Sequence, residues 1–138
     1  MRKHHTKTKG DLGVLKAQCA LAEQGFMVLV PQTEHSEFDL VGYKNGKFVR
    51  IQVKYRSMDK HGTLQVHFRS TWADSNGLHA SPLNKNEVDV YCIYCSDTDK
   101  CYFFDHNMFG KSVALRVDTP KNNQRQNVHF ADDYLRVP

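Results

Sequence analysis

The sequence predicts an α+β fold, in which a central mixed β-sheet is flanked by helices and carries an added β-hairpin. A helical pattern occurs near the N-terminus, several strand-like runs follow it, and little helical periodicity returns later. One junction between two such runs is Asn45-Gly46, the pair most typical of a tight hairpin turn. A chain of 138 residues, 40% of them apolar, suffices for a single domain over residues 1–138.

The helix is expected from Asp11 to Gln24. Its apolar residues recur at intervals of three and four, as on the stripe of an amphipathic helix: Leu12, Leu15, Cys19 and Ala22, with Val14, Ala17 and Leu21 beside it. Gly25 is placed to end the helix, because glycine readily adopts the left-handed conformation that follows many helices. Residues 1–9 are basic and polar, and we expect them to form a loose arm.

The strands are expected where apolar or alternating runs meet turn residues. Residues 26–31 form a short apolar run that ends at a proline, which predicts a buried strand. Residues 38–43 and 47–55 flank the Asn-Gly pair and predict the first hairpin. Further strands are expected at the remaining runs, with a second hairpin across residues 96–100 and a loop over 71–87: 63–70, 88–95, 101–105 and 112–117.

Two of the four cysteines form a CxxC pair, Cys92 and Cys95, which is followed by Cys101 and His106. Zinc requires four converging ligands. The pair lies inside an apolar strand-like run, and residues three apart on a strand point to opposite faces. We therefore expect buried thiols in the core in preference to a zinc site.

The net charge of +4 and the pI near 8.9 permit a nucleic-acid partner without requiring one. No apolar run approaches the roughly 18 to 20 residues that span a bilayer, so no membrane association is expected. The basic N-terminus has no apolar segment behind it of the kind found in signal peptides. The sequence therefore predicts a non-secreted, cytoplasmic protein with reduced thiols.

The turn also predicts which side chains meet across the first hairpin. If Asn45 and Gly46 form the two-residue loop, Asp39 falls opposite Gln52, and Lys54 lies diagonally across on the same face. A carboxylate, an amide oxygen and an ammonium then gather at one end of the hairpin. The alternative is a surface ion pair between Asp39 and Lys54, which contributes about 0 to 1 kcal/mol. The other face is expected to be core: Phe38, Leu40, Val49, Ile51, Val53 and Tyr55.

An acid at the start of one strand, a hairpin, and then (D/E/Q)-x-K on the next strand resemble the signature of PD-(D/E)XK nucleases. Here these residues are Asp39 and Gln52-Val53-Lys54. Residues 9–57 are similar in particular to the PD-(D/E)XK homing endonucleases of group I introns. The resemblance implies an endonuclease that hydrolyses double-stranded DNA at a specific sequence with Mg²⁺, for which Mn²⁺ can substitute.

The resemblance also implies roles for individual residues. Asp39 and the backbone carbonyl of Val53 would bind the metal, and Lys54 would orient and help to activate the attacking water. Gln52 stands where most relatives carry an acid, so it offers an oxygen without a negative charge. Mg²⁺ prefers such oxygen ligands and often takes only one or two carboxylates beside the substrate phosphate.

One acid of the family pattern is missing. The glutamate on the first helix of relatives would fall at Val14, and the nearest acid is Asp11, one turn earlier. Asp11 is therefore a candidate metal and catalytic residue, and a favourable acid in the first turn of the helix is the alternative. The loop before Asp39 also carries polar residues that could support the site or simply face solvent: Glu34, His35, Ser36 and Glu37.

Candidate DNA-binding residues lie in three segments: Tyr55, Arg56 and Ser57 after the lysine; Gln65, His67 and Arg69 on the polar face of the strand at 63–70; and Lys121, Gln124 and Arg125 in a basic loop. Cations bind phosphates, whereas amides and imidazoles can read base edges. Each segment would also suit a solvated surface. Because one chain carries one site, cleavage of both strands implies a homodimer or homotetramer.

Two other functions fit the same residues. The first is a structure-specific nuclease, because Holliday junction resolvases share the PD-(D/E)XK core. The second is a DNA-binding module on this fold with weakened catalysis, which Val14 and Gln52 both favour. Cleavage of supercoiled DNA and of a four-way junction, with and without Mg²⁺, distinguishes the three.

Overall fold

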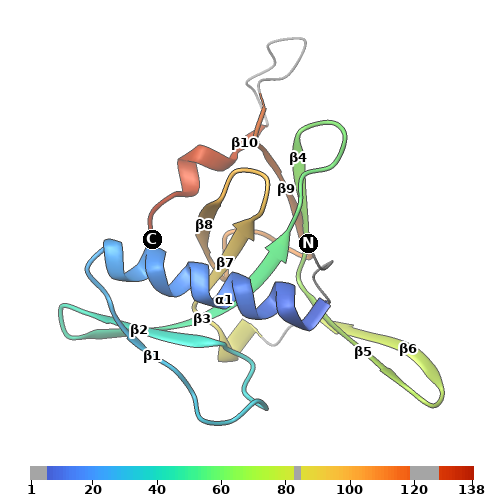
Figure 1. The fold of residues 1–138 in the computed structure, drawn as a ribbon, viewed down its shortest axis with the longest axis horizontal. Coiled ribbons are helices and arrows are strands. Elements are labelled where there is room, and N and C mark those ends of the chain that lie inside the picture. The colour runs from blue at the N-terminus through green and yellow to red at the C-terminus, as the bar shows by residue number, and fades with distance from the viewer. Residues whose placement is uncertain (1–5, 83–84, 119–127) are drawn as a thin grey trace.

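The structure is a computed structural model that describes residues 6–82, 85–118 and 128–138. A single α-helix, α1, lies across one face of a sheet, and a narrow hairpin projects from the body (Figure 1). The elements of the described residues are α1 (Thr6–Glu23), β1 (Met27–Leu29), β2 (Leu40–Lys44), β3 (Lys47–Arg56), β4 (Thr63–His67), β5 (Arg69–Asp74), β6 (Gly77–Pro82), η1 (Lys85–Glu87), β7 (Val90–Cys95), β8 (Lys100–Asp105), β9 (Ser112–Arg116), β10 (His129–Phe130) and η2 (Ala131–Tyr134).

Helix α1 begins earlier and ends where the sequence predicted. It starts at Thr6, so the last residues of the expected loose arm are helical. At its end, the N–H of Phe26 donates to the carbonyl of Leu21, and the N–H of Gly25 donates to the carbonyl of Ala22. Gly25 has a φ of 87°, so the predicted helix stop is confirmed as the paired hydrogen-bond motif that glycine favours.

The first hairpin forms around Asn45-Gly46 as predicted. Both residues have positive φ, 54° and 79°, as the type I′ turn requires. Lys44 pairs with Lys47, and the ladder continues in that register to Leu40 opposite Ile51. The turn chemistry therefore determines the pairing over the whole length of β2.

The main sheet has five strands in the order β1-β2-β3-β7-β8. Strands β3 and β7 are parallel and the other neighbours are antiparallel, which confirms a mixed sheet. The second hairpin, β7–β8, is also confirmed. Strand β1 is an edge strand, and Met27 and Leu29 are 60% and 39% exposed. The prediction of a buried strand at residues 26–31 was wrong, because only Val28 in β1 points toward the core.

Two apolar clusters cover the two faces of the sheet. On one face, Ala17 and Leu21 of α1 pack on Leu40, Ile51 and Cys92. The predicted helix stripe was wrong for Leu15, Cys19 and Ala22, which are exposed, because α1 buries the neighbouring stripe instead. The other face is covered by a second sheet, β10-β9-β4, and by η2. In the described residues α1 is the one α-helix, so the expected flanking by helices holds for one face only.

The run at residues 63–70 divides into two strands at Phe68. Leu64, Val66 and Phe68 are buried, and Gln65 and His67 between them are exposed, so the predicted alternation is confirmed in β4. Strand β5 then pairs with β6 in a separate two-stranded ribbon. The prediction of a loop over residues 71–87 was wrong there, because this polar ribbon pairs with itself and needs no apolar face.

The cysteines confirm the expectation of core thiols. Cys92 packs in the cluster beneath α1, and Cys95 packs in the cluster on the opposite face, as their spacing on a strand requires. Cys101 is also buried, and Cys19 is exposed on the helix. None of the helices in the described part of the chain is long and apolar enough to cross a membrane.

Candidate metal and catalytic site

Asp39 immediately precedes β2, and it lies beside the part of β3 that extends beyond the β2–β3 pairing. Its N–H donates to the carbonyl of Ile51 at 2.8 Å, although Leu40 is the residue opposite Ile51 in the ladder. Asp39 and Leu40 therefore both lie opposite Ile51, which is the arrangement of a β-bulge. The carboxylate Oδ2 accepts a hydrogen bond of 2.8 Å from the N–H of Val53. The expected position of Asp39 opposite Gln52 is corrected accordingly: the carboxylate meets the backbone of β3 one residue further on.

The bulge also moves the residue before Asp39. Phe38 packs in the cluster of the second sheet, whereas Leu40 packs beneath α1. The expectation that both would share the core face with Ile51 was therefore wrong for Phe38. An extra residue in a strand reverses the alternation of side chains beyond it, and turn chemistry at the far end of the hairpin carries no signal of that change.

The Asp39 carboxylate is largely buried, and burial raises its pKa above the ordinary aspartate range. The hydrogen bond from Val53 and the charge of Lys54 act in the opposite direction and do not fully offset that cost. A buried carboxylate with incomplete compensation gains from a nearby cation. Its environment therefore suits a metal ligand better than a surface ion pair.

The pKa of Lys54 is shifted in the direction opposite to that of Asp39. Burial, followed by the like charge of Arg56, lowers its pKa to about 8, and Asp39 only partly opposes this shift. A lysine with a pKa near 8 has an appreciable neutral fraction close to physiological pH, which a group that accepts a proton requires. Lys54 and Arg56 are two apart on β3, so their side chains share the sheet face that α1 does not cover.

The Gln52 side chain lies on that face too, and only the nitrogen of its amide has a hydrogen-bond partner among the described residues. Its Nε2 donates to the carbonyl of Glu37 at 3.0 Å. Its Oε1 is buried and has no hydrogen-bond partner among the described residues. Val53 supplies a further oxygen, because the N–H and C=O of one strand residue point toward the same neighbour, and its N–H points toward Asp39.

These donors fit a hard divalent cation. One carboxylate, one orphaned amide oxygen and one main-chain carbonyl are oxygen ligands of the kind that Mg²⁺ takes with waters and a substrate phosphate. The described residues contain no group of three or more His, Cys, Asp or Glu side chains that could hold a metal by themselves. These residues would thus supply part of a coordination shell with a single negative charge.

The structure does not bring Asp11 to this cluster. Gly13 of α1 faces Val53 and Tyr55, and Asp11 is exposed, about 160° around the helix from Gly13. Val14 is half-buried against the cluster beneath α1. Asp11 lies in the second turn of α1, so the N-terminal cap alternative is wrong.

The residues after Lys54 separate to different sides of β3. The Tyr55 ring lies 5.5 Å from that of Tyr94 under α1. Arg56 stays on the face of Lys54 and donates to the carbonyl of Tyr55 at 2.8 Å. Ser57 is exposed, and its Oγ lies 3.0 Å from that of Ser96. Of the three, Arg56 is therefore the one whose side chain shares the face of Lys54.

The other candidate DNA-binding residues are more distant in the chain. Gln65 and His67 are exposed on β4. Arg69 begins β5, and only its backbone is described. The three basic-loop candidates lie outside the described residues: Lys121, Gln124 and Arg125.

The loop before Asp39 contacts the site through its backbone. Ser36 Oγ donates to the carbonyl of Phe38 at 2.6 Å, and the Glu37 carbonyl accepts from Gln52. Glu34 and His35 are exposed. Ser36 and Glu37 thus shape the loop that holds the Gln52 amide.

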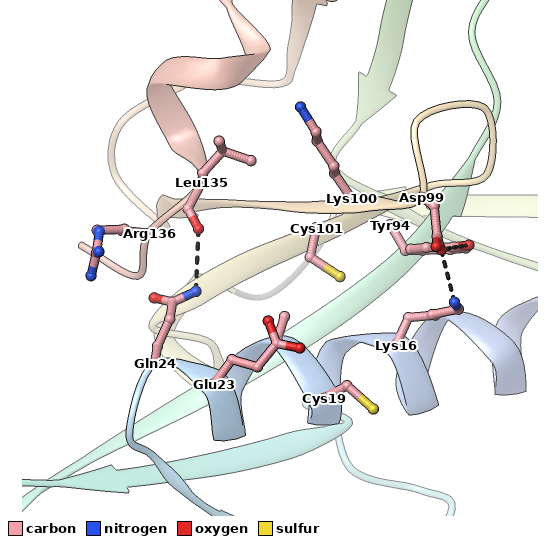
Figure 2. Close-up of a pocket in the computed structure, with 11 residues that line it drawn as sticks. Lys16, Cys19, Glu23, Gln24, Tyr94, Asp99, Lys100, Cys101, Leu135 and Arg136 are labelled. Carbon is pink, nitrogen blue, oxygen red and sulfur yellow. Dashed lines mark hydrogen bonds and ion pairs between the residues drawn. The ribbon is translucent and has the colours of Figure 1, made fainter.

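A separate hollow lies away from this cluster. It encloses about 720 Å³ between α1, the β7–β8 turn and the C-terminal segment (Figure 2). Lys16 and Asp99 form an ion pair of 2.8 Å across it, and Gln24 donates to the carbonyl of Leu135. None of the four residues of the nuclease signature lines it. Its ion pair and hydrogen bond link α1 to the β7–β8 turn and to the C-terminal segment.

Tyr91 is a residue of the site region that sequence reasoning missed. It is the partner of Gln52 in the parallel β3–β7 ladder, and its hydroxyl is buried without a hydrogen-bond partner. The pair is separated by 39 residues in sequence, and a parallel register has no local turn signal. Only the assembled sheet could have identified it.

Comparison with known proteins agrees with this geometry. The model of a family described as PD-(D/E)XK endonuclease matches residues 4–137. Among solved structures, the bacterial homing endonuclease I-Ssp6803I is similar with a TM-score of 0.77 and 27% sequence identity, over 95% of this chain and 88% of that chain. Among curated protein sequences there is no significant match.

Proposed function

This chain belongs to the PD-(D/E)XK endonuclease family and is a DNA endonuclease, and we propose that it is a Mg²⁺-dependent homing endonuclease that cuts both strands of a specific sequence. The similarity to a homing endonuclease over 95% of the chain supports the specific assignment. The observation that carries the proposal is local. The residues of the family signature lie around one hydrogen bond of 2.8 Å, which the N–H of Val53 donates to the carboxylate of Asp39. Gln52 and Lys54 are the residues on either side of Val53.

Phosphodiester hydrolysis needs a nucleophilic water, a stabilised phosphate charge and an assisted leaving oxygen. A bound divalent cation would supply the positive charge and acidify a water. The Asp39 carboxylate, the Gln52 amide oxygen and the Val53 carbonyl would hold it. The Lys54 amine, whose pKa is about 8, would take the proton of the attacking water or stabilise the developing charge.

Gln52 makes the site dependent on its substrate. With a glutamine in place of the usual acid, the protein would contribute one carboxylate, so its cation affinity in the absence of DNA would be weak. A phosphate oxygen of the substrate would then add a ligand and the missing negative charge. The same feature supports the alternative of a DNA-binding module with weakened catalysis.

A cleavage assay separates the candidate functions. Incubation with supercoiled plasmid carrying the target, with scrambled plasmid and with a four-way junction should give linear product from the target alone, in the presence of Mg²⁺ or Mn²⁺. Cleavage of the junction alone would indicate a structure-specific nuclease. Tight duplex binding with no cleavage in either metal would indicate the catalytically weakened module.

Double-strand cleavage requires two sites, and the main sheet has a surface suited to a second copy. On the face opposite α1, β1 and the start of β3 form an open apolar face: Met27, Leu29, Tyr43 and Phe48. Phe48 is 64% exposed. Monomeric proteins rarely leave such contiguous apolar surface to solvent.

The charge of this face favours another protein over DNA. The neighbouring cation, Arg50, is already held by Asp89 at 3.0 Å. β1 is also an edge strand, and an antiparallel edge can pair with its own copy across a two-fold axis. Since Phe48 lies six residues from Lys54 on β3, about 20 Å away, docking here leaves the catalytic end accessible.

Sedimentation of Phe48→Lys tests this interface. The variant should sediment as a smaller species than wild type and should convert plasmid to nicked rather than linear product. Leu15→Lys, on the exposed side of α1 and 59% exposed in wild type, is the matched control and should retain the wild-type assembly. An unchanged assembly in Phe48→Lys would remove the open apolar face as the interface.

A further inference from the structure

Two buried side-chain polar atoms among the described residues lack a hydrogen-bond partner: Gln52 Oε1 and Tyr91 Oη. They belong to cross-strand partners in the β3–β7 ladder. In-register residues of parallel strands project from the same face of the sheet, so both side chains with an unpaired atom lie on the face opposite α1.

Leaving both atoms unpaired is costly. A buried polar group without a partner costs roughly 1 to 3 kcal/mol, and native structures contain few of them. Tyr91 is 1% exposed, and its ring packs on Phe68 and Phe104 at centroid distances of 4.7 and 6.0 Å. The apolar packing fixes the ring, so the hydroxyl cannot turn outward to reach solvent.

The Gln52 amide is fixed as well. Its Nε2 donates to the Glu37 carbonyl, which sets the plane of the amide and leaves Oε1 as the open end. On the opposite side of the same backbone stretch, Val53 is bonded to Asp39. The open amide oxygen and the phenol thus share one face of the sheet, and the Asp39 carboxylate contacts the backbone of the next residue of β3.

We propose that Tyr91 is a positioning residue of the metal site, whose hydroxyl accepts a hydrogen bond from a water on the cation that Gln52 Oε1 binds. This rests on the proposed function. A hydrated divalent cation supplies what each orphan lacks: positive charge for the amide oxygen and a strong donor for the phenol. A bound hydrated cation would therefore satisfy both groups together.

The proposal predicts opposite effects on stability and on metal binding. Tyr91→Phe deletes the unpaired hydroxyl, so the metal-free variant should unfold at a temperature equal to or above that of wild type. The same variant should bind Mn²⁺ about 10-fold more weakly by calorimetry, the loss typical of removing a group that supports a ligand shell. If Tyr91 were purely structural, Tyr91→Phe would instead lower the unfolding temperature and leave the affinity for Mn²⁺ unchanged.

Tyr102→Phe is the matched control. Tyr102 is equally buried, but its hydroxyl lies 3.0 Å from Thr98 Oγ1 and is paired. This variant should lower the unfolding temperature of the metal-free protein and leave Mn²⁺ affinity unchanged. Combining Tyr91→Phe with Gln52→Leu should weaken Mn²⁺ binding by less than the product of the two single losses, because the groups act on one cation.

The outcomes separate this inference from the function beneath it. If wild type binds Mn²⁺ and Tyr91→Phe binds it within about twofold, or if the metal-free variant is destabilised like Tyr102→Phe, the role of Tyr91 is overturned and the nuclease site stands. If wild type neither binds Mn²⁺ nor cleaves DNA with it, the metal site itself is wrong and the inference falls with it.

Discussion

The carboxylate of Asp39 accepts a hydrogen bond of 2.8 Å from the backbone N–H of Val53, the residue between Gln52 and Lys54. Val53 has no backbone partner in β2, because β2 begins only at Leu40, which pairs with Ile51. The side chain of Asp39 accepts the hydrogen bond of Val53 instead. This bond positions the one acid of the site against the three residues of the second half of the signature.

Asp39→Asn should abolish metal-dependent cleavage and retain the fold. Asparagine keeps an oxygen that can accept from Val53 but loses the charge that holds a cation. We expect a loss of cleavage rate on the order of 100-fold or more, with duplex binding largely unchanged. Single-turnover cleavage and a binding titration measure the two effects. Asp132→Asn, at an exposed acid in η2, is the control, and rapid cleavage by Asp39→Asn would remove the site assignment.

Gln52→Glu should tighten Mn²⁺ binding, because a second carboxylate adds charge to the shell. Gln52→Leu, of similar bulk, should weaken Mn²⁺ binding and cleavage together. Calorimetry with Mn²⁺ on the three proteins measures the series. Gln65→Glu adds the same charge on the exposed face of β4 and should leave affinity unchanged. Equal affinities across the Gln52 series would place that amide outside the coordination shell.

The stability of the metal-free protein should rise with pH because of Lys54. Its pKa is about 8 in the fold and 10.5 in the unfolded chain, so between these values the unfolded state binds more protons. Relative to Lys54→Met, wild type should therefore gain up to about 3 kcal/mol as pH rises through that interval. Urea unfolding in chelator at pH 7 and pH 10 measures the gain. Parallel profiles for the two proteins would contradict the burial of the amine.

Arg56→Ala should flatten the salt dependence of DNA binding. Each phosphate contact contributes about −0.9 to the slope of log K against log salt, so the slope should fall by about one for each subunit engaged. Target and scrambled duplexes should weaken alike. Arg136→Ala, beside the hollow near the C-terminus, is the control. Loss of discrimination between the duplexes, without a change in slope, would assign Arg56 to base reading.

Gly62→Ala should destabilise the second sheet more than Gly46→Ala destabilises the hairpin turn. Both glycines have positive φ, 74° and 79°, so each substitution carries a backbone cost of about 1 to 2 kcal/mol. Only at Gly62 would the new Cβ also meet a neighbour, with Asp118 Oδ2 at 2.5 Å and Asp118 Cβ at 2.8 Å. Thermal unfolding of both variants checks the order, and equal losses would show that Asp118 moves aside at no cost.

Local chemistry was enough to predict the helix end, the first hairpin and the alternation in β4. Gly25 and Asn45-Gly46 act on backbone dihedrals of their immediate neighbours, so their effect can be read from adjacent residues. The register from Lys44–Lys47 placed Gln52 and Lys54 on one face, and the resemblance carried by the Q-x-K triplet assigned them to a nuclease site. These features depend on contacts between residues close in the chain.

The tertiary structure decided the rest, because it depends on contacts that no local pattern encodes. The bulge at Asp39 redirected the carboxylate to Val53 and sent Phe38 to the opposite face. The parallel pairing of β3 with β7 placed Tyr91 beside Gln52 across 39 residues of sequence. Burial by the surrounding elements, and not sequence spacing, gave Asp39 and Lys54 their shifted pKa values, since desolvation is the largest cause of each shift.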